Sequence, residues 1–267
     1  MKSGRKRPGA RLGQHFLTGE WAARALTEAA HIQTGETVLE IGPGKGALTQ
    51  KLLATGGKVV AVEKDEALVA QLSETFAREI GSGALTVISG DIRDVTPEKL
   101  GLSAGRYVLA ANIPYYITGE IIRQFLSTGA QPRAIALLIQ KEVAERIIAR
   151  DRKESILSLS VKAYGTPKIV AKVSRGNFSP PPSVDSAILL ISDISKKSFS
   201  EVSEEAFFKV VKAGFASKRK FLANNLANQF PKADVAQAFA DCGMALNIRA
   251  EDVPLERWLA LTKSLSV

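Results

Sequence analysis

The sequence has very few residues that form disulfides or bind transition metals. It contains one cysteine, Cys242, and two histidines, His15 and His31, among 267 residues. A lone thiol cannot form an intramolecular disulfide, which favours a reducing compartment. Zinc sites take most of their ligands from cysteine and histidine, and three such residues in the whole sequence argue against a zinc cluster. We therefore expect a cytoplasmic protein with no metal ion.

Long apolar runs are also missing. No stretch is apolar over the roughly 20 residues that a membrane-spanning helix needs, so we expect no membrane partner. With 45% hydrophobic and 24% charged residues, the chain has the composition of a globular protein with a sizeable core. Its length allows one large domain, or a large domain followed by a small one.

Acidic residues are the third shortage. The chain has 27 Asp+Glu against 36 Lys+Arg, a net charge of +9, which favours a polyanionic partner. No acid precedes Glu20, whereas residues 1–11 are basic and are not followed by the hydrophobic run of a secretory signal. We interpret 1–11 as a basic arm that contacts phosphates. A disordered tail or an organelle transit peptide are the alternatives.

Glycine, by contrast, is concentrated where it can serve a nucleotide site. The apolar run Val38–Ile41 is followed by Gly42, Gly44 and Gly46 and then by a helical pattern. A buried strand, a tight turn and a helix start are how an α/β nucleotide site begins. The G-x-G-x-G spacing differs from both the dinucleotide fingerprint and the P-loop. A glycine turn without a ligand is the structural alternative.

Two acids follow later strands of the same pattern. Glu63 ends the apolar run from Lys58, about 20 residues after the glycine turn, where it is placed to accept hydrogen bonds from ribose hydroxyls. Asp91 ends a third strand that begins at Leu85. Asp91 suits either a hydrogen bond from the exocyclic amine of an adenine or an N-cap for the next turn, and local sequence does not separate the two.

A fourth strand, from Tyr107, runs into Asn112-Ile-Pro-Tyr115. An adenine N6 amine is a weak nucleophile because its lone pair is delocalised into the ring. The Asn112 amide oxygen and a neighbouring backbone carbonyl can accept its two hydrogens and stabilise the charge that develops. Tyr115 offers the base a face to stack on. A turn that merely ends the strand is the alternative.

In order and spacing, these segments resemble the rRNA adenine dimethyltransferases, and the C-terminal ones are most similar to the KsgA/RsmA type. The resemblance runs from about Arg11 to Leu261. It is based on the segments 14–17 (QHFL), 39–49 (LEIGPGKGALT), 62–65 (VEKD), 90–91 (GD), 112–115 (NIPY), 140–146 (QKEVAER), 178–186 (FSPPPSVDS) and 215–226 (FASKRKFLANNL).

The resemblance implies a fold, a donor and a reaction. The fold is α/β, a class I methyltransferase with a Rossmann-like, mostly parallel sheet and a small all-helical C-terminal domain. S-adenosylmethionine is the methyl donor, and the products are N6,N6-dimethyladenosines at two adjacent adenines near the 3′ end of small-subunit rRNA. The expected partner is an immature small ribosomal subunit, bound by a monomer. We place the methyltransferase domain at 1–192 and the RNA-contacting domain at 193–267.

The resemblance also implies roles for individual residues. The expected cofactor-binding residues are His15, Leu17, Gly42, Gly44, Glu63, Asp91, Ile92 and Asn112, and the expected catalytic residues are Asn112, Tyr115 and Phe178. Tyr115 and Phe178 would hold the target base. Position 15 is His where the family commonly has Asn, and position 116 is Tyr where it often has Asn, which leaves the role of Tyr116 open.

Three other functions compete with this one. A large-subunit rRNA methyltransferase of the macrolide-resistance type would share the first motifs, but the tail around 249–256 and F-x-P-x-P at 178–182 favour the small-subunit branch. A non-catalytic nucleic-acid-binding factor would not need the intact glycine turn, acids and Asn112. The glycine spacing argues against a dehydrogenase. Lys209, Lys212 and Lys218–Lys220 suggest a phosphate contact, with a solvated charged face as the alternative.

Overall fold

The computed structural model describes residues 15–265, so the predicted basic arm at 1–11 and Gln14 lie outside the described residues. The chain forms two compact units. The first runs to Ala144 and adds Lys168–Ser192; the second consists of Glu145–Pro167 and the chain from Asp193 onward. The division after Ser192 coincides with the predicted domain boundary. Residues 145–167, which we assigned to the first domain, belong to the second unit.

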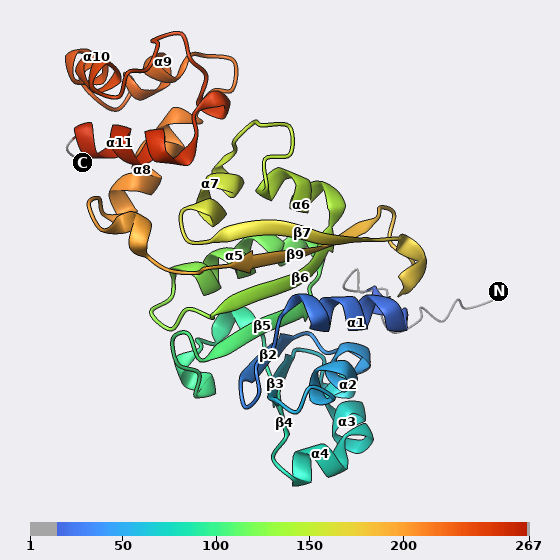
Figure 1. Ribbon diagram of the computed structural model, residues 1–267. Coiled ribbons are helices and arrows are strands. Elements are labelled where there is room, and N and C mark those ends of the chain that lie inside the picture. The colour runs from blue at the N-terminus through green and yellow to red at the C-terminus, as the bar shows by residue number, and fades with distance from the viewer. Residues whose placement is uncertain (1–14, 266–267) are drawn as a thin grey trace, which may run out of the picture. The chain divides into compact units, whose positions relative to one another are not determined.

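A seven-stranded sheet forms the centre of the first unit (Figure 1). Its strand order is β4-β3-β2-β5-β6-β9-β7. Neighbouring strands from β4 to β6 are parallel, and β9 runs antiparallel to β6. The sequence therefore predicted the mostly parallel sheet correctly. The strands are β2 (Thr37–Ile41), β3 (Lys58–Glu63), β4 (Leu85–Ser89), β5 (Tyr107–Asn112), β6 (Ala134–Gln140), β7 (Thr166–Val173) and β9 (Ser186–Ser192).

Helices cover both faces of this sheet, with α1 in front and α5 behind in Figure 1. Each of these two helices buries one apolar stripe, which for α1 includes Ala22, Ala23 and Leu26. Small residues on that stripe let the helix approach the sheet closely. The helices are α1 (Glu20–Ala29), α2 (Ala47–Leu53), α3 (Glu66–Thr75), α4 (Ala77–Gly81), α5 (Thr118–Ser127) and α6 (Lys141–Ile147).

One helix that the periodicity predicts as continuous, from about Glu66 to Ile80, is interrupted at Phe76. Phe76 leaves helical geometry, with φ −112° and ψ 29°. Its buried ring packs over the glycine turn so closely that a Cβ on Gly46 would lie 2.5 Å from the ring. Packing against the turn therefore outweighs helical propensity at this residue.

The second unit is helical. It contains α7 (Ile156–Lys162), α8 (Glu204–Gly214), α9 (Leu222–Leu226), α10 (Lys232–Asp241) and α11 (Leu255–Ser264). The helix expected over 218–229 is reduced to α9. The side-chain amide of buried Asn225 donates to the carbonyls of Gly214 at 2.6 Å and Ser217 at 2.9 Å. These two bonds stabilise a turn where the sequence pattern suggested another helical turn.

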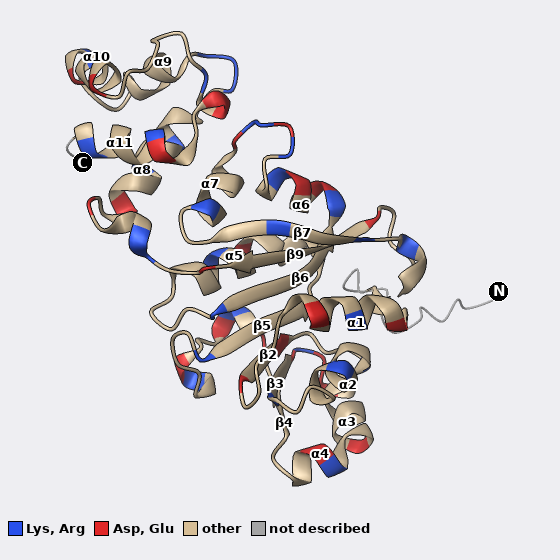
Figure 2. Ribbon diagram, in the orientation of Figure 1, with Lys and Arg blue, Asp and Glu red and all other residues tan. Residues whose placement is uncertain are grey.

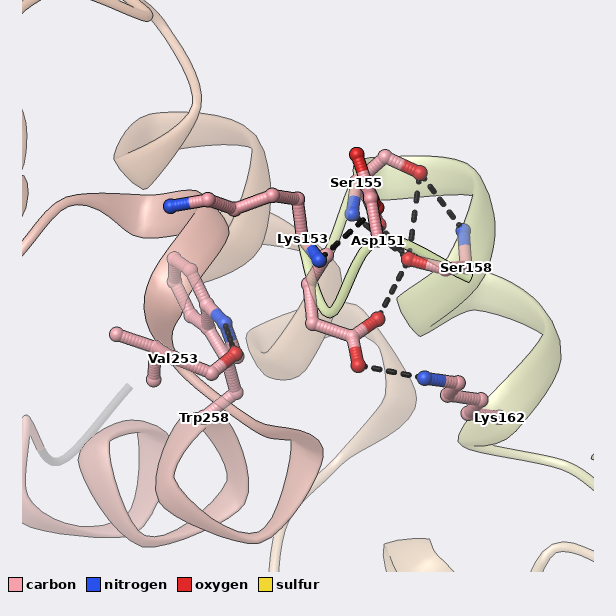
Figure 3. A network of polar contacts seen from close by, with 8 residues as sticks. Asp151, Lys153, Ser155, Ser158, Lys162, Val253 and Trp258 are labelled. Atoms are coloured by element: carbon pink, nitrogen blue, oxygen red, sulfur yellow. Dashed lines mark hydrogen bonds and ion pairs between the residues drawn. The ribbon is translucent and has the colours of Figure 1, made fainter. Parts of the chain in front are cut away.

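Polar contacts within residues 151–162 organise this segment (Figure 3), and two further contacts join it to the C-terminal part of the chain. The carboxylate of Glu154 accepts from the Ser158 hydroxyl at 2.6 Å and from the Lys162 ammonium at 2.5 Å. The backbone N–H of Glu154 donates to the carbonyl of Glu251 at 2.7 Å, and Lys153 forms an ion pair with Asp252. No helix within residues 15–265 is both long and apolar enough to span a lipid bilayer.

We predict that Gly214→Ala destabilises the second unit, because a Cβ there would lie 2.4 Å from the buried Trp258 ring and 2.6 Å from Leu222. Overpacking of this kind costs about 1–3 kcal/mol. Urea unfolding followed by Trp258 fluorescence measures it, in a Trp21→Phe background because the chain has two tryptophans.

Gly119→Ala is the matched control. Gly119 also lies in a helix, α5, but a Cβ there meets nothing within 4 Å. Higher helix propensity should make this variant neutral or more stable by up to about 1 kcal/mol. Equal effects of the two substitutions would contradict the packing explanation.

Candidate active site

A cavity opens at the carboxyl ends of the parallel strands β2, β3, β4 and β5. These strands pair in a common register, so that Ile41 of β2 lies beside Val62 of β3 and Ala111 of β5. The residues that follow each strand therefore meet at one edge of the sheet, which is where α/β folds bind ligands.

All but one of the predicted site residues line this cavity. They come from the segment before α1, from the glycine turn after β2 and from the ends of β3, β4 and β5. Those that line it are His15, Leu17, Gly42, Gly44, Glu63, Asp91, Ile92, Asn112 and Tyr115. Phe178 does not line it; its side chain is buried in the core beside Leu17.

A short strand pair that the sequence does not predict brings the N-terminal segment to this edge. Strand β1 (Phe16–Leu17) pairs antiparallel with β8 (Phe178–Ser179). The Nδ1–H of His15 then donates to the carbonyl of Pro180 at 2.8 Å. Phe178 thus helps to hold β1 in the first unit. Its contact with a target base stays a prediction.

Glu63 shapes the glycine turn. It is buried, and its carboxylate oxygens accept from the backbone N–H groups of Gly44 at 3.1 Å and Asp65 at 3.0 Å. Gly42 and Gly44 have φ of +65° and +59°, the left-handed region that glycine adopts without strain. The turn is therefore held against the end of β3 with its backbone exposed to the cavity.

A second buried acid, Glu40, lines the cavity although the sequence analysis did not single it out. One of its oxygens accepts from the Thr49 hydroxyl at 2.7 Å, and Oε1 has no hydrogen-bond partner among the described residues. Burial raises the pKa of Glu40 to about 8 against the opposing Thr49 bond, and the charge of Glu63 adds to the increase. An acid inside an apolar run, Leu39-Glu40-Ile41, was the available sequence signal.

Asp91 adopts the N-cap geometry that the sequence left as one of two alternatives. Its carboxylate accepts from the Arg93 backbone N–H at 3.1 Å. It also forms ion pairs with the Arg93 guanidinium at 2.6 Å and the Lys64 ammonium at 2.9 Å. The hydrogen bond from Arg93 lowers the pKa of Asp91 far below its usual value, so Asp91 is a carboxylate. Contact of Asp91 with an adenine stays a prediction.

The orientation of the Asn112 amide is set by its neighbour. Its Nδ2 group donates to the backbone carbonyl of His15 at 3.2 Å. Because that carbonyl can only accept, the nitrogen must face it and the oxygen must point elsewhere. Oδ1 has no hydrogen-bond partner within the described part of the chain, and the residue lines the cavity. Asn112 therefore presents a hydrogen-bond acceptor.

Tyr115 is held at two places. Its hydroxyl is hydrogen-bonded to that of Ser186, a fully buried residue at the start of β9, at 2.9 Å. Its ring stacks on His15 with centroids 5.9 Å apart and planes 29° from parallel. His15, rather than Phe178, is the ring beside Tyr115. Ser186 lies in the segment 178–186 of the sequence, but nothing there indicated its partner.

Comparisons with known proteins fit this geometry. A family model described as ribosomal RNA adenine dimethylase matches residues 6–266. The chain belongs to that family. The α/β fold with its mostly parallel sheet is consistent with this membership.

Relatives in this family match over nearly the whole chain. A ribosomal RNA small subunit methyltransferase A from Dehalococcoides mccartyi (strain CBDB1) is 40% identical, over 94% of this chain and 86% of its own. The protein of that name from Moorella thermoacetica is 36% identical, over 95% of this chain and 91% of its own.

Two solved structures share the fold. A dimethyladenosine transferase from Plasmodium falciparum has a TM-score of 0.78 and 27% identity, over 92% of this chain and 96% of its own. The 23S rRNA methyltransferase ErmE has a TM-score of 0.73 and 24% identity, over 94% and 100%. At that identity ErmE shows only the fold.

We predict that Tyr115→Phe and Ser186→Ala each slow methyl transfer by up to about tenfold, because each removes a hydrogen bond worth about 0.5–1.5 kcal/mol. Since both changes remove the same bond, the double variant should be no slower than either single one. Tyr115→Ala should be slower still, because it also removes the ring. Single-turnover rates measure these effects. Additive losses in the double variant would show that Ser186 acts by another route.

We also predict an unusual pH dependence of stability from Glu40. With a pKa of about 8 when folded and 4.5 as its reference value, Glu40 keeps its proton in the folded chain where the unfolded chain loses it. Its contribution to stability is therefore full below pH 4.5 and is lost as the pH rises to about 8. Urea unfolding of Glu40→Gln should show a gain over the original protein that grows across this range. A gain independent of pH would contradict the prediction.

Proposed function

We propose that the protein transfers methyl groups from S-adenosylmethionine to the N6 amines of two adjacent adenines near the 3′ end of small-subunit rRNA, giving N6,N6-dimethyladenosine. The observation on which this depends most is the Asn112 oxygen, an acceptor at the cavity that has no hydrogen-bond partner among residues 15–265. Family membership and the relatives named ribosomal RNA small subunit methyltransferase A support the choice of RNA.

The acids of the cavity suit a positively charged donor. The carboxylate of Asp91 and the buried carboxyl group of Glu63 line it, and the protonated Glu40 adds an oxygen, Oε1, that lacks a hydrogen-bond partner among the described residues. S-adenosylmethionine supplies an electrophilic methyl group on a sulfonium. We assign the ribose to Glu63, the adenine to Asp91 and Ile92, and the remaining walls to His15, Leu17, Gly42 and Gly44.

The side chains of the site would act on the target amine rather than on the donor. The Asn112 oxygen accepts one N6 hydrogen and a backbone carbonyl accepts the other, which orients the nitrogen lone pair. The Pro114 carbonyl already accepts from the Ile117 N–H at 3.2 Å, which favours the Ile113 carbonyl. Tyr115 stacks on the extruded base, and Phe178 is assigned to the same base as a second aromatic ring. No nucleophilic side chain is required.

Affinity for RNA would come largely from phosphates. The turn before α9 exposes Lys218, Arg219 and Lys220, and Figure 2 shows this loop as basic. Lys209 and Lys212 on α8 are also exposed. Together with the arm at 1–11, these groups would make binding strongly salt-dependent. We propose an immature small ribosomal subunit as partner, a monomeric enzyme without metal and a cytoplasmic location.

The competing functions are less well supported. The two relatives at 40% and 36% identity are named for the small subunit, whereas the large-subunit enzyme shares only the fold. A non-catalytic RNA-binding factor would have no use for an acceptor oriented as in Asn112. A dehydrogenase would need to bind NAD at the glycine turn.

Asn112→Ala should cut methylation of small-subunit particles at least about a hundredfold while RNA affinity changes little, because the phosphates supply most of that affinity. Single-turnover assays on unmethylated particles, with dimethyladenosine mapped in the rRNA, measure this. Exchange of Lys218, Arg219 and Lys220 for glutamine is the converse control, which should weaken binding and spare the rate at saturation.

Calorimetry completes the test. S-adenosylmethionine and its demethylated product should bind, and NAD should not. Near-normal methylation by Asn112→Ala would place the chemistry elsewhere, and saturable NAD binding would favour the dehydrogenase.

A further inference from the structure

Two consecutive tyrosines lie at the cavity in different surroundings. Both Tyr115 and Tyr116 line it. Tyr115 is part-buried and hydrogen-bonded to Ser186, whereas 66% of Tyr116 is exposed to solvent. They belong to a single 3₁₀ turn, Tyr115–Ile117, which directs neighbouring side chains apart. One ring is thus inside the cavity and the next is at its mouth.

The backbone beneath Tyr116 is held rigidly. Ile117 and Thr118, which follow it, are buried, and Ile113 is 2% exposed. The Ile117 N–H closes the turn on the Pro114 carbonyl. By contrast, no hydrogen bond or ring contact joins the Tyr116 side chain to another described residue, and the Arg93 guanidinium is an electrostatic neighbour of its hydroxyl. A large ring on a fixed backbone loses little conformational freedom when a flat partner covers it.

We propose that Tyr116 stacks on the nucleotide base next to the target adenine and that it is a specificity-determining residue of the site. The proposal rests on the proposed function, because it requires that an adenine be drawn into the cavity. An extruded base no longer stacks on its neighbour in the strand. An exposed ring at the mouth replaces that lost contact.

Stacking at this position would favour a substrate with two adjacent adenines, each of which must enter the cavity in turn. When either of two adjacent adenines enters the cavity, a purine neighbour is available to cover Tyr116. Aromatic stacking accepts any base but gains most from a large π-face. Asparagine, which the resembling family often has here, offers no such face.

A mutant cycle between protein and RNA isolates the contact. Small-subunit particles are assembled with rRNA whose 3′ segment is ligated from a synthetic strand, either intact or abasic at the nucleotide beside the target. In the absence of S-adenosylmethionine, Tyr116→Ala should weaken binding to intact particles about tenfold. The same change should weaken binding to abasic particles less than twofold. Tyr116→Phe should bind as the original protein does, and Tyr116→Asn should resemble the alanine variant.

Fluorescence of 2-aminopurine at the neighbouring nucleotide reports stacking directly. The original protein and Tyr116→Phe should quench it on binding, and Tyr116→Ala should not. Phe221→Ala is the control, since Phe221 is an exposed aromatic residue, at 42%, in the second unit. Its effect on affinity should be the same for intact and abasic particles.

Equal quenching by Tyr116→Ala and the original protein, or equal losses of affinity on both particles, would overturn the proposal. Neither readout involves methyl transfer. Failure of the proposed function would instead appear as methylation that survives Asn112→Ala, so the two failures are distinguishable.

Discussion

The common register of the parallel strands is the constraint on which the site depends. Each strand in the series β4-β3-β2-β5 ends at nearly the same level, because Ile41 pairs with both Val62 and Ala111. Gly42, Glu63 and Asn112 therefore emerge side by side although they are far apart in sequence. A slip of one residue would turn every core side chain of a strand to the opposite face. The apolar sheet core that fixes the register thus also fixes the site.

Much of this arrangement follows from local sequence. Strands that are buried on both faces consist of apolar runs in the sequence. The residues at the end of such a run must lie at the sheet edge, and the sequence therefore predicts the positions of Glu63, Asp91 and Asn112. Contacts between distant segments have no such local signal. The pairing of β1 with β8 joins residues more than 150 positions apart, and the partner of Ser186 is a tyrosine on another strand's loop. Phe178 was assigned to the target base from the resemblance, and its motif says nothing about which way the ring turns; that role stays a prediction.

Where local rules failed within the fold, tertiary contacts were the reason. The periodicity of 66–80 is helical throughout, yet Phe76 breaks it to cover Gly46. The pattern over 218–229 is also helical, yet the Asn225 amide binds two carbonyls and creates a turn that presents Lys218–Lys220. Residues 145–167 join the second unit through the Glu154 backbone N–H, which donates to the Glu251 carbonyl, and through the ion pair of Lys153 with Asp252. In each case one or two specific contacts outweigh the weak preferences of several residues.

Charged side chains of both signs meet at the cavity. The chain is basic overall, yet the cavity holds Glu40, Glu63 and Asp91, two of them almost completely buried. Burial raises the pKa of Glu40, whereas Arg93 keeps Asp91 ionised at the mouth. The carboxyl groups of Glu63 and Asp91 would attract a cationic donor, whereas Lys45, Lys64 and Arg93 at the same cavity, together with the basic residues of the second unit, would attract the phosphates of RNA. The side chains assigned to the base itself, Asn112, Tyr115 and Tyr116, are an amide and two phenols.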